Sequence, residues 1–279
     1  MVCHLKVEVP QKKYLIGGWN INMGYLKDKI SQLTLPDKIN KSIEALKLAS
    51  KMSEQYYHRP LIITYSGGKD SDVMLNLAKR SGINFEVYHS HTTADAPQTV
   101  YHVRNVFDKL HSEGIRTKIV YPTYKGKRTS MWDLIVQKKM LPTRRYRYCC
   151  DILKETTGKN RFISTGVRAD ESRNRSDRKM FTIYSSSVNH RIYHDIEHVA
   201  EVYDDAQKYP EVYDCKYITS LKKNKTSMVN PIVEWNVVDI WNYIKDNNVE
   251  VCNLYDMGYD RVGCVGCPLA SQRKREGVF

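Results

Sequence analysis

Apolar residues between Leu26 and Tyr57 recur at intervals of three or four positions, with a break near Pro36. This spacing is that of amphipathic helices. We therefore expect two helices here, forming an N-terminal helical extension over residues 1–58.

Short apolar, β-prone runs then alternate with segments of helical spacing. The predicted strands are Leu61–Tyr65, Phe85–His89, Lys118–Tyr121 and Arg161–Thr165, and the predicted helices between them are Val73–Ala78, Gln98–Ser112 and Met131–Lys139. Alternating strands and helices indicate βαβ units. The predicted fold over residues 59–270 is therefore α/β, a doubly wound, mostly parallel sheet with its pocket at the carboxyl ends of the strands.

The pattern loosens into polar, basic and tyrosine-rich sequence between Arg173 and Lys225, where we expect loops or an insertion. The apolar pattern typical of regular secondary structure resumes at Met228–Trp235 and continues in a predicted helix over Val237–Asp246. A Cys-containing C-terminal region follows, and residues 271–279 form a short basic tail in which a helix starts and breaks off. We expect this tail to be truncated relative to related proteins.

Composition agrees with a folded protein, since 279 residues with 41% hydrophobic content can bury a core. No run of about 18 apolar residues occurs, and charged residues interrupt the first ten positions. We expect a soluble, cytoplasmic protein with no membrane partner.

The chain is strongly basic, with 44 Lys and Arg against 31 Asp and Glu and a net charge of +13. Such a field attracts nucleotide phosphates or nucleic acid. Basic residues that only solvate the surface are the alternative, so charge alone does not identify a partner.

The loop Ser66–Ser71, with sequence Ser-Gly-Gly-Lys-Asp-Ser, lies between a predicted strand and a predicted helix. Two glycines let the backbone approach a phosphate closely, and a helix N-terminus supplies N–H donors. Ser66 and Ser71 add hydroxyls and Lys69 adds a cation. Asp70 either caps the helix or helps hold Mg²⁺.

Four of the seven cysteines form two tight pairs, Cys149-Cys150 and Cys264-x-x-Cys267. This pattern indicates a metal or redox site rather than a disulfide scaffold. Four thiolates suit zinc or an iron–sulfur cluster, and buried free thiols are the remaining alternative. Cys252 is a substitute ligand, whereas Cys3 and Cys215 are isolated.

The sequence resembles a known family at this point, because Ser66–Ser71 match the SGGxDS signature of PP-loop ATP pyrophosphatases. The further blocks resemble the branch that contains phosphoadenosine phosphosulfate (PAPS) reductases and DNA phosphorothioation sulfurtransferases. These blocks are His91–Pro97, Tyr148–Lys154, Thr165–Ser172, Asn230–Ile232 and Gly263–Pro268. The resemblance implies an adenine nucleotide alpha hydrolase-like fold.

The resemblance also implies roles for particular residues. Ser66, Gly67, Gly68, Lys69, Asp70 and Ser71 would bind ATP or a sulfonucleotide (PAPS or APS), with Gly166 and Arg168 across the same pocket. Lys69, Asp70 and Arg168 would be catalytic. Arg168 and Arg173 are candidate anion clamps, although Arg173 is equally a solvated surface residue. Asp95 would contact the ribose or a metal, or only cap the next helix.

The pairs Cys149-Cys150 and Cys264-x-x-Cys267 resemble the ligand set of a [4Fe-4S] cluster in this family, and Zn²⁺ is the alternative occupant. The twelve residues after Cys267 include no cysteine. The nucleophile that sulfonucleotide reduction requires is therefore not evident.

The leading hypothesis is an enzyme that cleaves ATP to an adenylate and pyrophosphate and activates an acceptor for sulfur transfer. Nucleic acid is a candidate acceptor, because tyrosines and arginines after Arg173 suit stacking and backbone contacts. A cysteine desulfurase or a thioredoxin-like protein is the candidate donor. The alternatives are a sulfonucleotide reductase using an external thiol and a nucleotide-binding accessory subunit without turnover.

Overall fold

The computed structural model describes residues 33–154, 157–171, 175, 178–184, 191–197, 199–200, 204 and 226–268. All of these except Leu33 belong to one compact unit, Thr34–Phe279. Of the two predicted N-terminal helices, the second is described, and the segment of the first lies outside the described residues.

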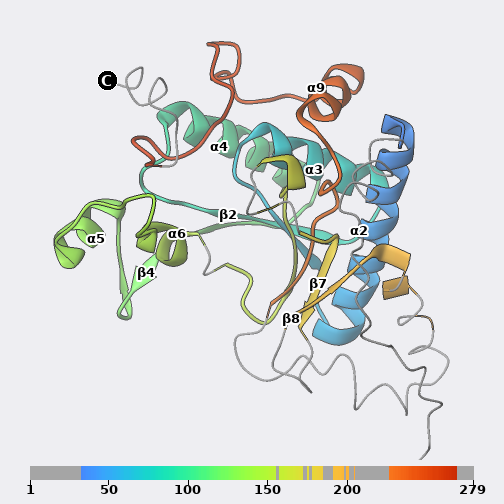
Figure 1. The fold of residues 1–279 in the computed structure, drawn as a ribbon, viewed down its shortest axis with the longest axis horizontal. Coiled ribbons are helices and arrows are strands. Elements are labelled where there is room, and N and C mark those ends of the chain that lie inside the picture. Colours follow the sequence, from blue (N-terminus) through green and yellow to red (C-terminus); the bar gives the residue numbers. More distant parts are fainter. Residues whose placement is uncertain are drawn as a thin grey trace, which may run out of the picture. The chain divides into compact units, whose positions relative to one another are not determined.

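Seven strands form the main sheet (Figure 1). Their order across the sheet is β3 (Thr117–Val120), β2 (Phe85–Ser90), β1 (Leu61–Thr64), β6 (Phe162–Ser164), β9 (Ser227–Val229), β7 (Phe181–Tyr184) and β8 (Arg191–His194). The first five are parallel, whereas β7 runs antiparallel to β9 and β8 antiparallel to β7. The predicted α/β fold with a mostly parallel sheet is confirmed.

The chain changes direction across the sheet between β1 and β6. It runs outward from β1 through β2 to β3, then returns to the other side of β1 and continues to β9. In open α/β sheets, ligands usually bind beside such a reversal, at the carboxyl ends of the two central strands. The loops that meet here follow β1 and β6.

Local signals account for the helix boundaries. The described helices are α2 (Leu35–Tyr57), α3 (Lys69–Ser81), α4 (Pro97–Ser112), α5 (Met131–Lys138), α6 (Tyr148–Leu153) and α9 (Val237–Asp246), with a 3₁₀ turn at Ala169–Glu171. Thr34 and Asp37 form a capping box that starts α2, and Pro36 occupies its first turn. The break expected near Pro36 is therefore the start of this helix.

The main core lies between the sheet and helices α2, α3, α4 and α9. Leu61, Ile63 and Tyr65 alternate along β1 and belong to this core. Ile62 faces the other way and is also fully buried. Its register partner Ile163 is buried as well, so both faces of the central strands are covered.

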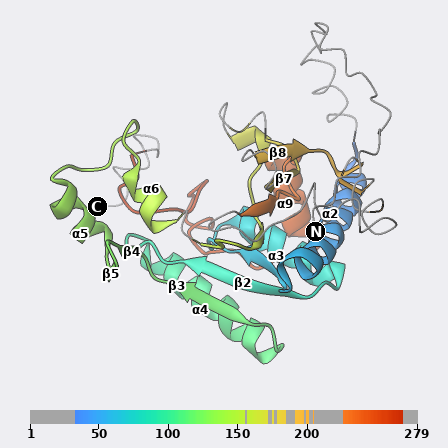
Figure 2. The same ribbon diagram turned by 90° about the horizontal axis from the view of Figure 1, so that it is seen from below.

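A smaller group of elements lies on the opposite side of the described chain from α2 in both ribbon views (Figures 1 and 2). It contains the antiparallel pair β4 (Thr123–Tyr124) and β5 (Lys127–Arg128) together with α5 and α6. Its own core includes Met131, Leu134 and Leu153. We call residues 121–150 the basic lobe, for reasons given below.

One expectation about the fold was wrong. Loops or an insertion were expected over Arg173–Lys225, and the loop alternative is wrong for Phe181–Tyr184 and Arg191–His194, which form β7 and β8 and extend the sheet. Phe181–Tyr184 and Arg191–His194 are only four residues each, so their β-prone alternation is hard to distinguish from loop sequence. Within the described part of the chain, no helix is long and apolar enough to cross a membrane.

Candidate functional site

The loop after β1 adopts a backbone that requires glycine. Gly67 has φ +75, and a Cβ atom there would lie 2.9 Å from Cγ2 of Val103 on α4. Both the left-handed backbone and the close approach disfavour any side chain. The loop therefore passes tightly over α4 before α3 begins.

Ser71 closes the loop from the first turn of α3. Its Oγ accepts hydrogen bonds from the N–H groups of Ser66, at 3.3 Å, and Gly68, at 3.1 Å, and donates to the Gly68 carbonyl at 2.7 Å. Gly68 is the N-cap of α3. The hydroxyl thus holds the loop in a closed turn against the helix N-terminus, where anions are favoured.

The loop after β6 contacts the start of α3 directly. A Cβ atom on Gly166 would lie 3.3 Å from the carbonyl carbon and oxygen of Asp70. Larger residues would push the two loops apart. Gly166 therefore allows the loops of β1 and β6 to meet where the direction of the sheet reverses.

Asp70 lies between two cations. Arg168, only 5% exposed, donates from Nε to Oδ1 of Asp70 at 2.5 Å, and its Nη1 lies 3.4 Å from Asp170. Oδ2 of Asp70 is 3.7 Å from Nζ of Lys69. The guanidinium expected to clamp an anion is thus engaged by two carboxylates, while Arg173 lies outside the described residues.

Lys69 is buried under the C-terminal segment. Its N–H donates to the hydroxyl of Tyr255 at 2.9 Å, and its Nζ donates to the carbonyl of Asp260 at 3.0 Å. The ammonium also lies 5.3 Å from the ring centre of Tyr255 and 5.9 Å from that of Trp241. Burial raises the pKa of Tyr255, so its hydroxyl stays protonated at neutral pH.

A buried polar cluster lies behind the loop. Tyr65 donates to Oδ1 of Asp72 at 2.5 Å, and Nε2 of His102 lies 3.1 Å from the same oxygen. Burial raises the pKa of Asp72, which is 4% exposed, despite these contacts. Burial and the charge of Asp72 also raise the pKa of Tyr65. Asp72 belongs to α3, so the cluster links the phosphate loop to α4.

The cysteine pairs come from two distant parts of the chain. Cys149 and Cys150 lie in the first turn of α6, and Cys264 and Cys267 flank a turn in which Cys267 N–H donates to the Cys264 carbonyl at 3.3 Å. Cys149 and Cys264 pack against the same small core. Burial, with Cys150 next to it, raises the pKa of Cys149 to about 11.

Lys154 provides a positive charge beside these thiols. Burial would lower its pKa, but Cys264 and Asp95 outweigh this effect and raise it. Cys252 is buried elsewhere, close to Thr99 and Asp72. The structure therefore separates Cys252 from the two pairs.

The four sulfurs of the two cysteine pairs do not form a closed set of metal ligands in the described part of the chain. Four sulfurs at about 2.3 Å from one zinc ion would lie about 3.8 Å from one another. Among the described residues, the group of three or more possible ligand atoms within 4.8 Å of one another is His89, His91 and Asp95, and it contains no cysteine.

Asp95 does not cap the following helix. Ala96 is the N-cap of α4, and Oδ2 of Asp95 instead accepts the N–H of Thr92 at 2.9 Å. Asp95 also pairs with Cys264 in an isolated antiparallel β-bridge. Of the three roles expected for Asp95, contact with a ribose and contact with a metal stay predictions.

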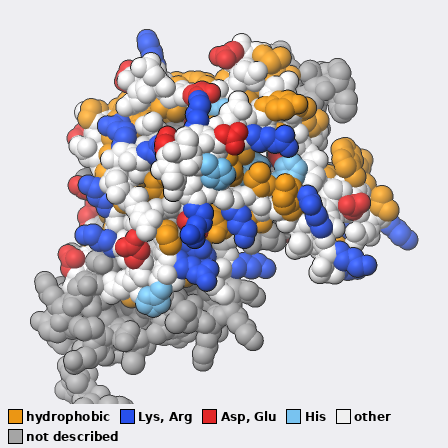
Figure 3. Space-filling view, turned by 180° about the vertical axis from the view of Figure 1, so that it is seen from behind, with side chains coloured by type: hydrophobic (Ala, Val, Ile, Leu, Met, Phe, Trp, Pro, Cys, Tyr) orange, Lys and Arg blue, Asp and Glu red, His pale blue; other side chains and the backbone are white. Residues whose placement is uncertain are grey.

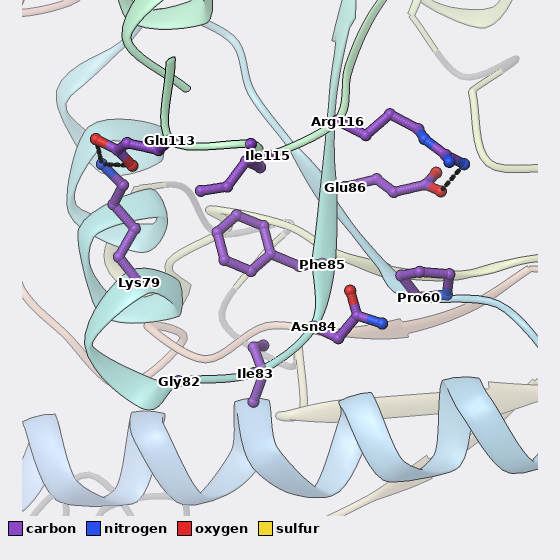
Figure 4. Close-up of a pocket in the computed structure, with 11 residues that line it drawn as sticks. Pro60, Lys79, Gly82, Ile83, Asn84, Phe85, Glu86, Glu113, Ile115 and Arg116 are labelled. Atoms are coloured by element: carbon purple, nitrogen blue, oxygen red, sulfur yellow. Dashed lines mark hydrogen bonds and ion pairs between the residues drawn. The ribbon is translucent and has the colours of Figure 1, made fainter. Parts of the chain in front are cut away.

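A cavity of the described chain lies away from all of these residues. It has a volume of about 610 Å³ and opens at the amino ends of the strands, between Pro60, Phe85 and Arg116 (Figure 4). Figure 4 shows the ion pairs Lys79–Glu113 and Arg116–Glu86 at its sides. None of the predicted site residues lines it, so it is separate from the phosphate loop.

Sequence reasoning missed several residues of the site. Tyr255, Asp260 and Trp241 carry no motif, and only the fold brings them to Lys69. The sequence did contain a signal for His89 and His91, because two histidines separated by one residue at the end of a strand can bind the same metal ion.

Comparison with known proteins identifies similar chains. The family model of the phosphoadenosine phosphosulfate reductase domain matches residues 60–270. An uncharacterized protein of Methanocaldococcus jannaschii is 25% identical over 88% of this chain and 48% of its own length. Sulfate adenylyltransferase subunit 2 of Geobacter metallireducens is 27% identical over 70% of this chain and 60% of its own length.

Among solved structures, phosphoadenylyl-sulfate reductase from Candida auris, in complex with phosphate, matches with a TM-score of 0.48 and 16% identity. The match covers 89% of this chain and 97% of that one. The chain spans about half the length of the curated relatives it matches.

Proposed function

Because the chain belongs to the phosphoadenosine phosphosulfate reductase domain family, we propose that it cleaves ATP between the α and β phosphates and activates an acceptor for sulfur transfer. The observation that carries the proposal is the meeting of the Ser66–Ser71 loop with Gly166 where the sheet reverses direction. The similarity to a sulfate adenylyltransferase subunit supports adenylyl transfer, a reaction that releases pyrophosphate from ATP.

In the proposed reaction, an acceptor oxygen attacks the α-phosphorus, the bond to the bridging oxygen breaks, and pyrophosphate leaves. A sulfide nucleophile then displaces the adenylate from the acceptor, and AMP leaves. The N–H groups at the start of α3 would hold the phosphates. Lys69 would offset the negative charge that develops on pyrophosphate, and Arg168 would position Asp70 through their ion pair.

Mg²⁺ suits the carboxylate of Asp70, because this ion prefers oxygen ligands and is usually held by one or two carboxylates together with phosphates. Asp70 would hold the ion, and the ion would supply charge neutralisation at the phosphates. Arg168 and Lys69 balance the negative charge of this carboxylate.

The acceptor we propose is a nucleic acid, and the surface that would bind it is the basic lobe. Residues 121–150 contain eight Lys or Arg and a single acidic residue, Asp133. The side chains exposed here also include Trp132 at 66% and Tyr146 at 58%. In Figure 3 the lobe lies on the right, and basic and hydrophobic side chains share its surface. Cations for the backbone and aromatic faces for the bases are the two requirements of single-strand binding.

The cysteine pairs would hold a [4Fe-4S] cluster, because four thiolates are its usual ligands and Cys149 and Cys264 pack against the same small core. The small core of the basic lobe contains Met131 and Leu134 and also contacts Cys149 and Cys264. A cluster there would supply redox-active iron and sulfide between the acceptor surface and the nucleotide. The sulfur itself would come from a donor such as a cysteine desulfurase, together with a thiol reductant that supplies the two electrons needed to release its persulfide sulfur as sulfide.

Two glycines at opposite ends of α3 provide a matched test of this proposal. Gly67 and Gly82 have φ +75 and +67, so alanine at either position is strained by about 1–3 kcal/mol. Only Gly67→Ala would also contact Val103 and displace the phosphate loop. We expect it to lower ATP affinity roughly 10- to 100-fold, whereas Gly82→Ala binds normally. Isothermal titration with Mg²⁺ and ATP measures this effect.

The products formed from ATP and from PAPS distinguish the proposed reaction from its two alternatives. Anaerobically purified protein is incubated with Mg²⁺ and ATP, and separately with PAPS and a reduced thiol carrier, each with and without nucleic acid. AMP and pyrophosphate from ATP, lost in Gly67→Ala and kept in Gly82→Ala, are the expected result. Sulfite from PAPS without ATP cleavage would favour a sulfonucleotide reductase, and nucleotide binding without product would favour an accessory subunit.

A further inference from the structure

Three side chains with metal-binding atoms meet at the carboxyl end of β2. His89 and His91 are two positions apart, so an extended strand directs both to the same face. Thr93, with φ +62, turns the chain and returns Asp95 to the same place. One ligand atom from each of His89, His91 and Asp95 lies within 4.8 Å of the others.

Hydrogen bonds to the backbone orient two of these side chains. Nδ1 of His89 lies 2.9 Å from the carbonyl of Tyr65, so this nitrogen carries the proton and donates it. The other ring nitrogen, Nε2, then offers its lone pair. Oδ2 of Asp95 accepts the N–H of Thr92 and lies 3.9 Å from Nδ1 of His91. Such outer contacts, which fix the tautomer and the ring direction, are typical of metal ligands.

We propose that His89, His91 and Asp95 bind one divalent first-row transition-metal ion. Two imidazoles and one carboxylate suit Mn²⁺, Fe²⁺, Co²⁺ and Zn²⁺, and three protein ligands leave positions open for water or substrate. Two atoms bonded at about 2.1 Å to one ion are at most about 4.2 Å apart. Side-chain movements of about an ångström would therefore complete the site.

The position of the three side chains links the two parts of the candidate active site. Tyr65, which fixes His89, directly precedes the phosphate loop, and Asp95 pairs with Cys264. An ion held here would lie between the nucleotide pocket and the cysteine pairs. There it would act as a Lewis acid on an oxygen or sulfur ligand. The ammonium of Lys154, which is close to Asp95, would compete with weakly bound ions.

Mn²⁺ is the appropriate probe, because it favours nitrogen and oxygen ligands over cysteine. The free ion is titrated into the full-length protein without nucleotide and followed by electron paramagnetic resonance. We expect saturation at one equivalent, with electron spin echo modulation from imidazole nitrogen. His91→Ala should weaken binding at least tenfold and remove part of this modulation. Asp95→Asn, which keeps an oxygen acceptor for Thr92, should weaken it similarly.

Two control variants test whether Mn²⁺ binds to other side chains instead of to this site. His111→Ala removes an exposed histidine whose ring contacts the hydroxyl of Thr117, and Asp70→Asn removes the carboxylate of the phosphate loop. Both should bind Mn²⁺ like the parent protein. Absence of saturable binding, unchanged binding in both His91→Ala and Asp95→Asn, or loss only in Asp70→Asn would each overturn the proposal.

Discussion

Asp72 is a carboxylate whose burial should make stability depend on pH. Its folded pKa is raised, so the ionised form costs stability at neutral pH, and this cost is relieved as the pH falls through the folded pKa. Asp72→Asn keeps the shape without the charge. From pH 7 towards pH 4, the parent protein should gain stability relative to this variant. The gain is about 1.4 kcal/mol for each pH unit between the folded and unfolded pKa values.

Chemical denaturation of both proteins at several pH values measures this difference. Comparison with the variant cancels the titration of all other groups, which dominates the absolute stability. The opposite result would be a parent protein that loses stability relative to Asp72→Asn on acidification. It would mean that the hydrogen bonds from Tyr65 and His102 outweigh burial and lower the pKa of Asp72.

Single residues of the site were predictable where a local motif carries them. Ser66–Ser71 and Gly166 were placed from sequence, because glycine and serine spacing is a local property of the turn. Tyr255 was not, because its contact with Lys69 spans 186 positions. The pairing of Arg168 with Asp70, 98 positions apart, could likewise not be read from the chain. Long-range contacts depend on strand order, which periodicity alone does not determine.

Elements with their own start and stop signals were predicted closely. The helix expected over Val237–Asp246 has these bounds, because Asn236 and Asp239 form its capping box. The β7–β8 pair was missed, since each strand has only four residues and so short a run does not distinguish a strand from a loop. Pairing with β9, rather than local sequence, makes these segments strands.

Substitution of one cysteine tests whether the two cysteine pairs, which lie in separate segments of the chain, bind one iron–sulfur cluster. Cys264 lies in the C-terminal turn and Cys149 in α6, and both contact the same core. Cys264→Ser protein purified without oxygen should lose most of its iron and acid-labile sulfide, because one of four ligands is removed. Cys252→Ser is the matched control, since Cys252 is buried away from the pairs. Full metal content in Cys264→Ser, or zinc in place of iron in the parent protein, would contradict the cluster.

At the scale of the molecule, the net charge is unevenly distributed. The chain carries +13 overall, and residues 121–150 alone carry +7. Nucleic-acid contacts were expected after Arg173, and most of that segment lies outside the described residues. The basic lobe was not anticipated, although its eight basic residues lie within 30 consecutive positions of the sequence. They belong to β5, α5 and the loops beside these elements.

This distribution predicts where nucleic acid binds. Lys127→Glu with Arg145→Glu reverses two exposed charges of the basic lobe, and Lys47→Glu with Lys51→Glu makes the same change on the exposed face of α2. Anisotropy of a labelled single-stranded oligonucleotide is measured against salt. Each lost phosphate contact lowers the slope of log affinity against log salt by about 0.7, so the lobe variant should lose about 1.4. The α2 variant should keep its slope. Equal effects in the two variants would mean that overall charge attracts the nucleic acid, because both change the total field equally.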